Sequence, residues 1–177
     1  MDVKNFTNIF LACIKPGNKV LDLGAGEGKF TQMFFERGAI VTAVDMQPPT
    51  FHNVALIVKK MKIEDFCASE ENEHYDLIFA RNVIQFLDKL WVFETLFPWM
   101  NKHLAPGGIV AIETFYQEPE PPFGHNMISL YTLKELISNF MTWKEIDARE
   151  NDYFGLDMSG QKRRFFVSSL IVQKTKE

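Results

Sequence analysis

Short apolar runs alternate with amphipathic helical patterns along the first two thirds of the chain. Runs rich in Val, Ile and Leu predict strands at residues 19–23, 40–44, 75–80 and 109–114. A fifth segment, residues 54–60, is ambiguous between a strand and a helical turn. Strands separated by helices favour parallel pairing through right-handed crossovers, so the pattern predicts an α/β sheet covered on both faces.

Helical spacing appears between these strands and on either side of them. Residues 29–37 place their large apolar side chains on one helical face. Residues 88–104 predict a longer amphipathic helix that is broken or kinked near Pro98. Shorter helices are expected at residues 5–14 and at residues 132–140, where the second begins with a threonine suited to an N-cap.

The last third of the chain has a different organisation. Residues 117–122 read Gln-Glu-Pro-Glu-Pro-Pro, which excludes a helix and predicts an extended loop. Residues 143–152 and 163–173 alternate like strands, and Asp-Met-Ser-Gly at 157–160 suits a hairpin turn. The chain is therefore expected to finish its sheet with an antiparallel hairpin.

Composition narrows the class of protein. A chain of 177 residues suits one domain, and 46% hydrophobic with 24% charged residues is typical of a globular protein. The 17 phenylalanines are expected mainly in the core, with an aromatic substrate pocket as the alternative. A net charge of −4 without a long run of Lys or Arg disfavours nucleic-acid partners.

Cysteine usage and hydropathy indicate a cytoplasmic protein. Cys13 and Cys67 lack metal-ligand spacing and are expected to be buried, reduced thiols. The chain shows no signal-peptide pattern and no run of about 18 apolar residues, so we expect no association with a membrane.

Residues 20–28 form the strongest local motif, a strand that leads into Gly-Ala-Gly-Glu-Gly. Glycines allow a sharp turn and let a ligand approach the main chain. The spacing is G-x-G-x-G rather than the dinucleotide pattern G-x-G-x-x-G. Glu27 would also face a bound phosphate, and two like charges about 4 Å apart repel by roughly 4 kcal/mol near a protein surface. The loop therefore favours a ligand that carries a cationic group.

Asp45 ends the next predicted strand, about 20 residues after the glycine loop. A carboxylate at this place can accept hydrogen bonds from both hydroxyls of a ribose. The alternative is a turn-forming residue before Pro48 and Pro49. Met46 follows and is expected to lie against an adenine, or else to be a plain core residue.

Together these segments resemble the class I S-adenosylmethionine-dependent methyltransferases, and the resemblance runs from about residue 18 to residue 115. Residues 20–30 resemble the family's first motif, V-L-D-x-G-x-G-x-G, and residues 41–46 resemble the second. The resemblance implies that the methionine part of the cofactor lies at the loop, the ammonium near its aspartate and the ribose at Asp45. The residues so implied in the first motif are Asp22, Gly24, Ala25, Gly26 and Gly28.

Three later segments extend the resemblance. Residues 62–66 look like the turn beside the adenine, with Lys62 where the family has an acid; Ile63 can still offer its backbone N–H, and Glu64 is the alternative for the acid. Residues 75–87 are similar to the fourth-strand motif. Leu-Ala-Pro-Gly-Gly at 104–108 matches the L-x-P-G-G turn before the fifth strand.

The family resemblance implies a three-layer Rossmann-like fold with a mostly parallel seven-stranded sheet, order 3-2-1-4-5-7-6, ending in the antiparallel hairpin. Within one domain, 1–177, we expect a short N-terminal helix (1–17), a cofactor-binding core (18–115), and a substrate-side loop, helix and hairpin (116–177). The short chain and compact hairpin resemble the tellurite-resistance (TehB-like) methyltransferases. The usual second helix is expected to be short or missing, and the N-terminal extension that forms a lid in many relatives to be nearly absent.

Polar and aromatic side chains after the fourth and fifth strands are the candidates for acceptor binding and chemistry. Asn82 is expected to cap the following helix, while Arg81 is expected to form either a surface ion pair or a contact with a carboxylate. Methyl transfer needs a base only when the acceptor must lose a proton, so the catalytic residue is unknown, with Glu113 and His125 as candidates. The cofactor set also includes Arg81, Asn82 and Phe86; the substrate set is Arg81, Gln85, Phe115 and Tyr116; no metal is expected.

Three functions remain compatible with the sequence. The leading one is a methyltransferase that uses S-adenosyl-L-methionine and a small-molecule acceptor in an in-line displacement. The alternatives are a non-catalytic or partner-dependent S-adenosylmethionine-binding subunit, and an NAD(P)-dependent oxidoreductase, which Glu27 and the G-x-G-x-G spacing oppose. A homodimer or protein partner that covers an open cofactor cleft would use Phe6, Ile9 and Phe10 as interface residues.

Overall fold

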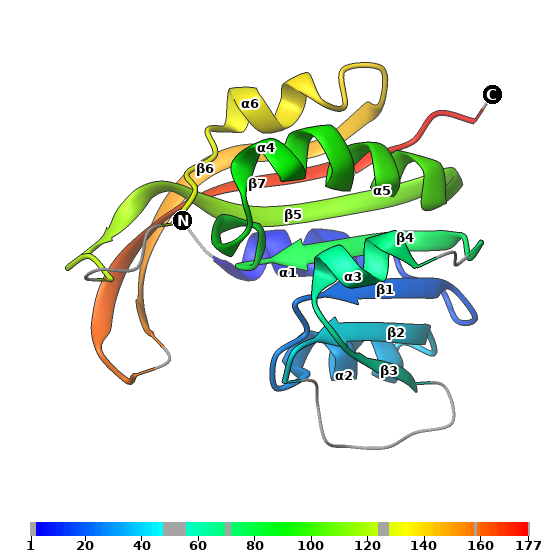
Figure 1. Cartoon of the computed structure of the whole chain (residues 1–177), viewed down its shortest axis with the longest axis horizontal. Coiled ribbons are helices and arrows are strands. Elements are labelled where there is room, and N and C mark those ends of the chain that lie inside the picture. Colours follow the sequence, from blue (N-terminus) through cyan, green and yellow to red (C-terminus); the bar gives the residue numbers. More distant parts are fainter. Residues whose placement is uncertain (1–2, 48–55, 70–71, 124–127, 158, 177) are drawn as a thin grey trace.

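The computed structural model describes residues 3–47, 56–69, 72–123, 128–157 and 159–176. One seven-stranded sheet runs through it in the order β3-β2-β1-β4-β5-β7-β6. Helices cover both faces of this sheet, which gives three layers (Figure 1). The predicted strand order and layer architecture are confirmed.

The parallel half of the sheet comes from the apolar runs of the sequence. It consists of β1 (Lys19–Leu23), β2 (Ile40–Asp45), β3 (Leu56–Lys60), β4 (Tyr75–Arg81) and the first part of β5 (Leu104–Glu120). Burial on both faces explains why β1, β2 and β4 read as nearly continuous apolar runs. The ambiguous segment before residue 60 is a strand, β3, at the edge of the sheet.

The antiparallel half contains β6 (Lys144–Leu156) and β7 (Lys162–Gln173), and β7 pairs with both β5 and β6. The hairpin is confirmed, but β6 extends four residues beyond the predicted end at residue 152. The predicted loop at residues 117–122 was partly wrong, since β5 continues as far as Glu120. Pairing with β7 along this stretch keeps the proline-containing segment extended.

The two faces of the sheet carry different helices. On one face, α1 (Val3–Ala12) and α2 (Lys29–Glu36) pack against the strands and lie behind the sheet in Figure 1. The other face carries α3 (Ile63–Ala68), the helical segment from α4 (Lys89–Trp91) to α5 (Phe97–His103), and α6 (Leu133–Ser138). No helix appears between β2 and β3 in the described residues.

The kink expected near Pro98 is present as a change of helix type. Between α4 and α5 the chain forms a π-helical segment, η2 (Val92–Leu96), and Pro98 stands in the first turn of α5. Proline has no N–H to donate, so a wider turn before it accommodates the missing hydrogen bond.

Helix α6 begins as predicted. The Thr132 hydroxyl accepts from the backbone N–H of Glu135, and the Glu135 carboxylate accepts from the backbone N–H of Thr132. This reciprocal capping box satisfies two helix-terminal donors. The helix ends at Ser138, two residues before the predicted end.

Phenylalanines fill much of the core, as expected. Phe79 of β4 lies beside the rings of Phe10, Phe30 and Phe34, with centroid distances between 4.7 and 5.2 Å. Phe6 and Phe10 are buried in this cluster, so the hypothesis that they form an exposed interface was wrong. Their burial fixes α1 against the sheet.

Three smaller features complete the fold. Cys13 and Cys67 are free thiols, as predicted, but they are only partly buried. His103 is buried and stacked on Trp99, with its Nδ1 3.0 Å from the Glu73 carbonyl. Within the described residues no helix is both long and apolar enough to cross a membrane.

Candidate cofactor and acceptor site

The sheet register brings the predicted site residues to one edge. Leu23 pairs with Val44 and with Ala80, so β1, β2 and β4 finish at the same level. One residue further on, Arg81 pairs with Glu113 of β5. Ligands of parallel α/β sheets bind outside the carboxyl ends of the strands, and this edge therefore forms the candidate site.

The glycine loop turns sharply at this edge. Gly24, Gly26 and Gly28 all have positive φ, at 73°, 52° and 84°, a region that other residues rarely adopt. The backbone N–H groups of Gly24 and Ala25 donate to the Val44 carbonyl and hold the loop against β2. A Cβ at Gly26 would meet no atom within 4 Å, so glycine keeps a space open beside the main chain there.

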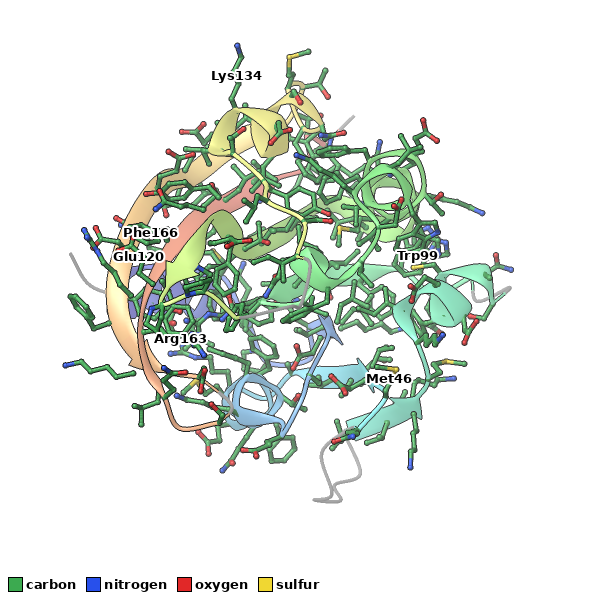
Figure 2. The ribbon with its side chains drawn as sticks, turned by 60° about the vertical axis from the view of Figure 1, so that its left-hand side comes forward. Met46, Trp99, Glu120, Lys134, Arg163 and Phe166 are labelled. Carbon is green, nitrogen blue, oxygen red and sulfur yellow. The ribbon has the colours of Figure 1, made fainter. Side chains whose placement is uncertain are left out.

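Asp45 links the loop to the end of β2. Its Oδ2 accepts from the backbone N–H of Gly26 at 2.9 Å, and its Oδ1 accepts from that of Gln47 at 2.8 Å. A carboxylate offers about four acceptor positions, so two remain for a ligand. Met46 follows with 62% of its surface exposed and stands beside the parallel strands, away from the labelled residues of β5 and β7 (Figure 2). It is therefore not a core residue.

Asp22 lies two residues before the loop and is buried. Its Oδ2 accepts from the Thr31 hydroxyl at 2.6 Å. Burial raises the pKa of Asp22 to about 7; the Thr31 hydrogen bonds oppose this shift and the charge of Asp45 adds to it. This carboxyl group therefore joins β1 to α2. Because it is buried, it can influence a ligand's ammonium only through its charge and not by direct contact.

The predicted adenine-side residues lie at the start of α3. Lys62 is exposed and precedes the helix without a side-chain cap, while the Ile63 side chain is buried. Glu64 is exposed in the first turn. An acid at residue 64, rather than 62, is thus available at the surface of this turn.

Arg81 and Glu113 form an ion pair in which Glu113 is buried and Arg81 is partly buried. The Arg81 Nε lies 2.6 Å from Glu113 Oε1, and the Ser169 hydroxyl donates to Glu113 Oε2 at 3.0 Å. The guanidinium also lies over the Phe30 ring, 4.8 Å from its centroid. Glu113 is only 1% exposed, so both of its oxygens are occupied by protein groups inside the fold.

Asn82 and Gln85 follow β4 and leave polar atoms without protein partners. Among the residues the structure describes, Asn82 Oδ1 and Gln85 Nε2 are buried and make no hydrogen bond. Asn82 also has a positive φ of 51°. Such atoms are costly in a native protein and often mark a place where a ligand completes the hydrogen bonding.

The prediction that Asn82 caps a helix was wrong. The next element is the 3₁₀ helix η1 (Ile84–Phe86), which begins after Val83 without a side-chain cap, whereas Asp88 caps α4 by accepting from the backbone N–H of Trp91. Phe86 on η1 is 59% exposed. The left-handed turn at Asn82 directs the chain away from β4.

The structure separates two of the predicted substrate residues. Phe115 is buried and packs on Phe165, whereas Tyr116 is partly exposed and contacts Phe166. Neighbouring residues of a strand point to opposite faces, so Phe115 and Tyr116 lie on different sides of β5. His125, the second candidate base, lies outside the described residues.

Tyr153 is a site residue that sequence analysis missed. It lies on β6, and its phenol is close enough to Arg81, Asn82 and Glu113 for these groups to shift its pKa. The predicted strand stopped at residue 152, so nothing in the local pattern placed Tyr153 near β4. Exposure alternates along β6 as far as Leu156, but the residues themselves, Glu-Asn-Asp-Tyr-Phe-Gly-Leu at 150–156, do not alternate between polar and apolar, so the sequence carried no signal for this extension.

Proteins similar to this chain in sequence are named as methyltransferases, and each matches it over only part of its own length. Trans-aconitate 2-methyltransferase from Azoarcus sp. (strain BH72) is 35% identical over 106 residues, which cover 58% of this chain and 41% of that enzyme. Phosphoethanolamine N-methyltransferase 1 from Arabidopsis thaliana is 31% identical over 118 residues, which cover 62% of this chain and 23% of that enzyme. The chain thus matches less than half the length of these two relatives.

Solved structures share the fold. TehB from Haemophilus influenzae has a TM-score of 0.76 and 21% identity, over 98% of this chain and 63% of that one. A Burkholderia thailandensis 1,6-didemethyltoxoflavin-N1-methyltransferase, solved with bound 1,6-didemethyltoxoflavin and S-adenosylhomocysteine, has a TM-score of 0.71 and 18% identity, over 98% of this chain and 78% of that one. A family model described as a methyltransferase domain matches residues 3–157. The chain therefore belongs to the methyltransferase-domain family and carries its class I, S-adenosylmethionine-dependent architecture.

Proposed function

We propose that the protein transfers a methyl group from S-adenosylmethionine to a small-molecule acceptor. The hydrogen bond from the Gly26 N–H to the Asp45 carboxylate is the observation that carries this proposal. It places a carboxylate that can bind ribose hydroxyls directly beside the open turn of the glycine loop. The relatives named above act on small molecules according to their names, which supports the same class of acceptor.

The residues at the edge fit this cofactor. Asp45 would hold the ribose through its two remaining acceptor positions, and exposed Met46 offers an apolar surface for the adenine. The space kept open at Gly26 accommodates the methionine part. When bound, S-adenosylmethionine supplies an electrophilic methyl group on a positively charged sulfur.

The protein's own contribution is to orient the acceptor beside the methyl group. Alignment of two reactants can be worth roughly 7–11 kcal/mol of the barrier, without a dedicated base. Glu113 is paired with Arg81 and Ser169, so we assign it to holding Arg81 in place rather than to proton transfer. Gln85 Nε2 is a free buried donor for the acceptor, between β5 and η1.

We place this activity in the cytoplasm, without nucleic acid, on the basis of the free thiols and the acidic net charge of −4. An NAD(P)-dependent activity is disfavoured because Glu27 is exposed at the start of α2, where it would face a diphosphate. A protein that binds S-adenosylmethionine without catalysis would share the same cofactor affinity. Only a turnover measurement distinguishes that role from the proposed one.

Isothermal titration with S-adenosylhomocysteine, S-adenosylmethionine and NAD tests the proposal. We expect the two methionine derivatives to bind and NAD not to bind. Asp45→Ala should weaken S-adenosylhomocysteine binding tenfold or more, since charge-assisted hydrogen bonds contribute about 1.5–3 kcal/mol each. Glu36→Gln removes a charge at the exposed end of α2 and is the matched control, with unchanged affinity.

Binding of NAD alone would overturn the proposed cofactor, and unchanged affinity of Asp45→Ala would overturn the ribose assignment. Release of S-adenosylhomocysteine during incubation with small-molecule acceptors then tests catalysis. Cofactor binding without any turnover across such acceptors supports the binding-subunit alternative instead.

A further inference from the structure

Three strands continue beyond the carboxyl end of β4. Arg81 is the last paired residue of β4, yet β5 runs seven residues past its partner Glu113. We call this part the overhang, made of residues 114–120 of β5, 151–156 of β6 and 162–167 of β7. Two irregularities in the β5–β7 register, on either side of Gln117, lie within it. Bulges bend strands, and Figure 1 shows the overhang curving past the ends of β4 and β1.

Arg163 holds the overhang in this shape. Its Nε lies 2.5 Å from Asp157 Oδ2 at the hairpin turn, and its Nη1 donates to the carbonyls of Pro121 and Pro122 after β5. The guanidinium also lies over the Phe123 ring at 5.2 Å. Figure 2 shows Arg163 on the curved strands, together with Glu120 and Phe166. The hairpin is therefore tied to the segment after β5.

Tyr153 points from this overhang toward the site. It pairs with Phe165 in the register, and the two rings lie 5.3 Å apart. Gly155 lies two residues further along the same face of β6, where a Cβ would come within 3.3 Å of the Tyr153 ring and 3.2 Å of the Phe165 ring. The absence of a side chain at Gly155 thus makes room for the tyrosine ring.

The phenol meets the polar groups at the end of β4. Burial and the charge of Glu113 raise the pKa of Tyr153, whereas the charge of Arg81 and the nearby Asn82 and Arg81 side chains lower it, and the net shift is upward. The phenol therefore keeps its proton at neutral pH. In the same group, Asn82 Oδ1 has no partner among the described residues. A phenol O–H and an amide oxygen are both suited to hydrogen bonds with an incoming molecule.

This end of the site carries no net charge. The Arg81 guanidinium is balanced by Glu113 at 2.6 Å, and Tyr153 and Asn82 are neutral. The surrounding surfaces are aromatic, with Phe30 under Arg81 and Phe165 beside Tyr153. A charged acceptor would lose its hydration here and find no opposite charge to replace it. A neutral ring with a hydroxyl or N–H group would instead pack on the aromatic surfaces and form hydrogen bonds that replace those to water.

We propose that Tyr153 binds the methyl acceptor directly and that this acceptor is an uncharged aromatic or heteroaromatic molecule with a hydroxyl or ring N–H group. The overhang supplies the tyrosine, and the end of β4 supplies Asn82 and the neutralised Arg81. This inference rests on the proposed methyltransferase function, because it assigns the acceptor side of the same site.

The test uses the full chain and a panel of acceptors at neutral pH. The panel contains phenols, N–H heteroaromatics, aliphatic carboxylates including trans-aconitate, and phosphoethanolamine, and S-adenosylhomocysteine release reports turnover. We expect turnover of uncharged aromatic members only. Tyr153→Phe should raise their KM about three- to tenfold, the effect of one lost hydrogen bond, with the Kd of S-adenosylhomocysteine and the Tm unchanged.

Two further variants separate acceptor contact from a structural role. Gly155→Ala keeps the phenol but crowds its ring, and should also raise the acceptor KM without altering cofactor affinity. Phe154→Leu changes the next residue of β6, which is 69% exposed, and should leave KM and kcat unchanged. A raised acceptor KM with unchanged cofactor affinity and unchanged Tm is expected only if Tyr153 contacts the acceptor.

Three results would overturn the inference. These are turnover of the charged members only, an unchanged acceptor KM in Tyr153→Phe, or a parallel loss of S-adenosylhomocysteine affinity, which would place Tyr153 at the cofactor. If no member is methylated, ligand-observed NMR on the protein saturated with S-adenosylhomocysteine decides, since failure of the uncharged members to bind contradicts the proposal. Failure of the proposed methyltransferase function can be told apart from failure of this inference, because in the first case the wild-type protein would not bind S-adenosylhomocysteine.

Discussion

Asp22 lies in β1 with its carboxyl group removed from water, directly behind the glycine loop. The Thr31 hydroxyl satisfies one of its oxygens, and Asp45 at the end of β2 adds a repulsive charge. Burial is the largest cause of the raised pKa of Asp22, about 7 against an ordinary value of 3.8. The folded protein therefore binds more protons than the unfolded chain between these two pH values.

This linkage predicts a pH-dependent stability. The free energy of unfolding should fall as the pH rises from about 4 through 7, because ionised Asp22 is disfavoured in the folded state. One pKa unit corresponds to roughly 1.4 kcal/mol, so the contribution is at most about 4 kcal/mol. Asp22→Asn keeps an acceptor for Thr31 and should flatten the dependence between pH 5 and 8.5.

Urea unfolding of the ligand-free protein at pH 5, 7 and 8.5 measures this effect. The variant should gain stability relative to wild type as the pH rises. Parallel curves for the two proteins would show that Asp22 is charged in the folded state throughout this range.

Single residues also show where sequence reasoning is reliable. Asp45 lies where its spacing from the glycine loop predicted, because strand ends and turn lengths are local properties. Asn82 was misassigned, because its left-handed backbone depends on the Asn82 N–H donating to the Glu113 carbonyl of β5. A contact between residues 31 positions apart leaves no trace in the local pattern.

At the scale of elements, the glycine loop packs directly on the segment after β4. A Cβ on Gly24 would overlap the Val83 side chain, so the first glycine of the motif serves contact between two elements. Gly26, by contrast, faces open space. The same motif therefore contains one glycine required for packing and one that leaves room for a ligand.

A pair of variants separates these effects. Gly24→Ala should lower the free energy of unfolding by about 2–5 kcal/mol, combining left-handed backbone strain with overpacking. Gly160→Ala in the hairpin turn is the matched control, since its φ of 81° is similar and a Cβ there meets no atom within 4 Å. It should lose only about 1–2 kcal/mol. Equal losses in denaturant titrations would mean that Val83 moves aside without cost.

The sequence predicted which segments form helices and strands better than it predicted where those helices and strands end. The break near Pro98 follows from proline's missing N–H, and the cap of α6 follows from Thr132 and Glu135. The extra length of β5 and β6 could not be predicted, because pairing with β7 keeps polar and proline-containing residues extended. The overhang and Tyr153 depend on that pairing.

On the scale of the whole molecule, Phe79 connects the sheet to both helices of one face. Its ring lies beside Phe6 and Phe10 of α1 and Phe30 and Phe34 of α2. Phe30 in turn supports the Arg81 guanidinium. The aromatic core and the candidate site are thus continuous through this face of the sheet.

Phe79→Ala should therefore destabilise the protein by about 3–5 kcal/mol, the usual effect of removing a buried aromatic ring. Phe154→Ala, on the exposed face of the hairpin, should change the free energy of unfolding by no more than about 0.5 kcal/mol. Chemical denaturation followed by circular dichroism measures both variants. A loss of similar size for the two would contradict the central position of Phe79.

The sequence by itself determined the parallel core, the glycine turn and the carboxylate at the end of β2, because these depend on periodicity and short spacings. Glycine spacing and the acid at residue 27 also disfavoured a diphosphate cofactor, and the resemblance to the methyltransferases implied S-adenosylmethionine. Only the tertiary structure decided that Glu113 neutralises Arg81, that Asn82 and Gln85 keep unpartnered atoms, and that Tyr153 reaches β4. These contacts join strands distant in the chain, and their formation requires the register and curvature of the completed sheet.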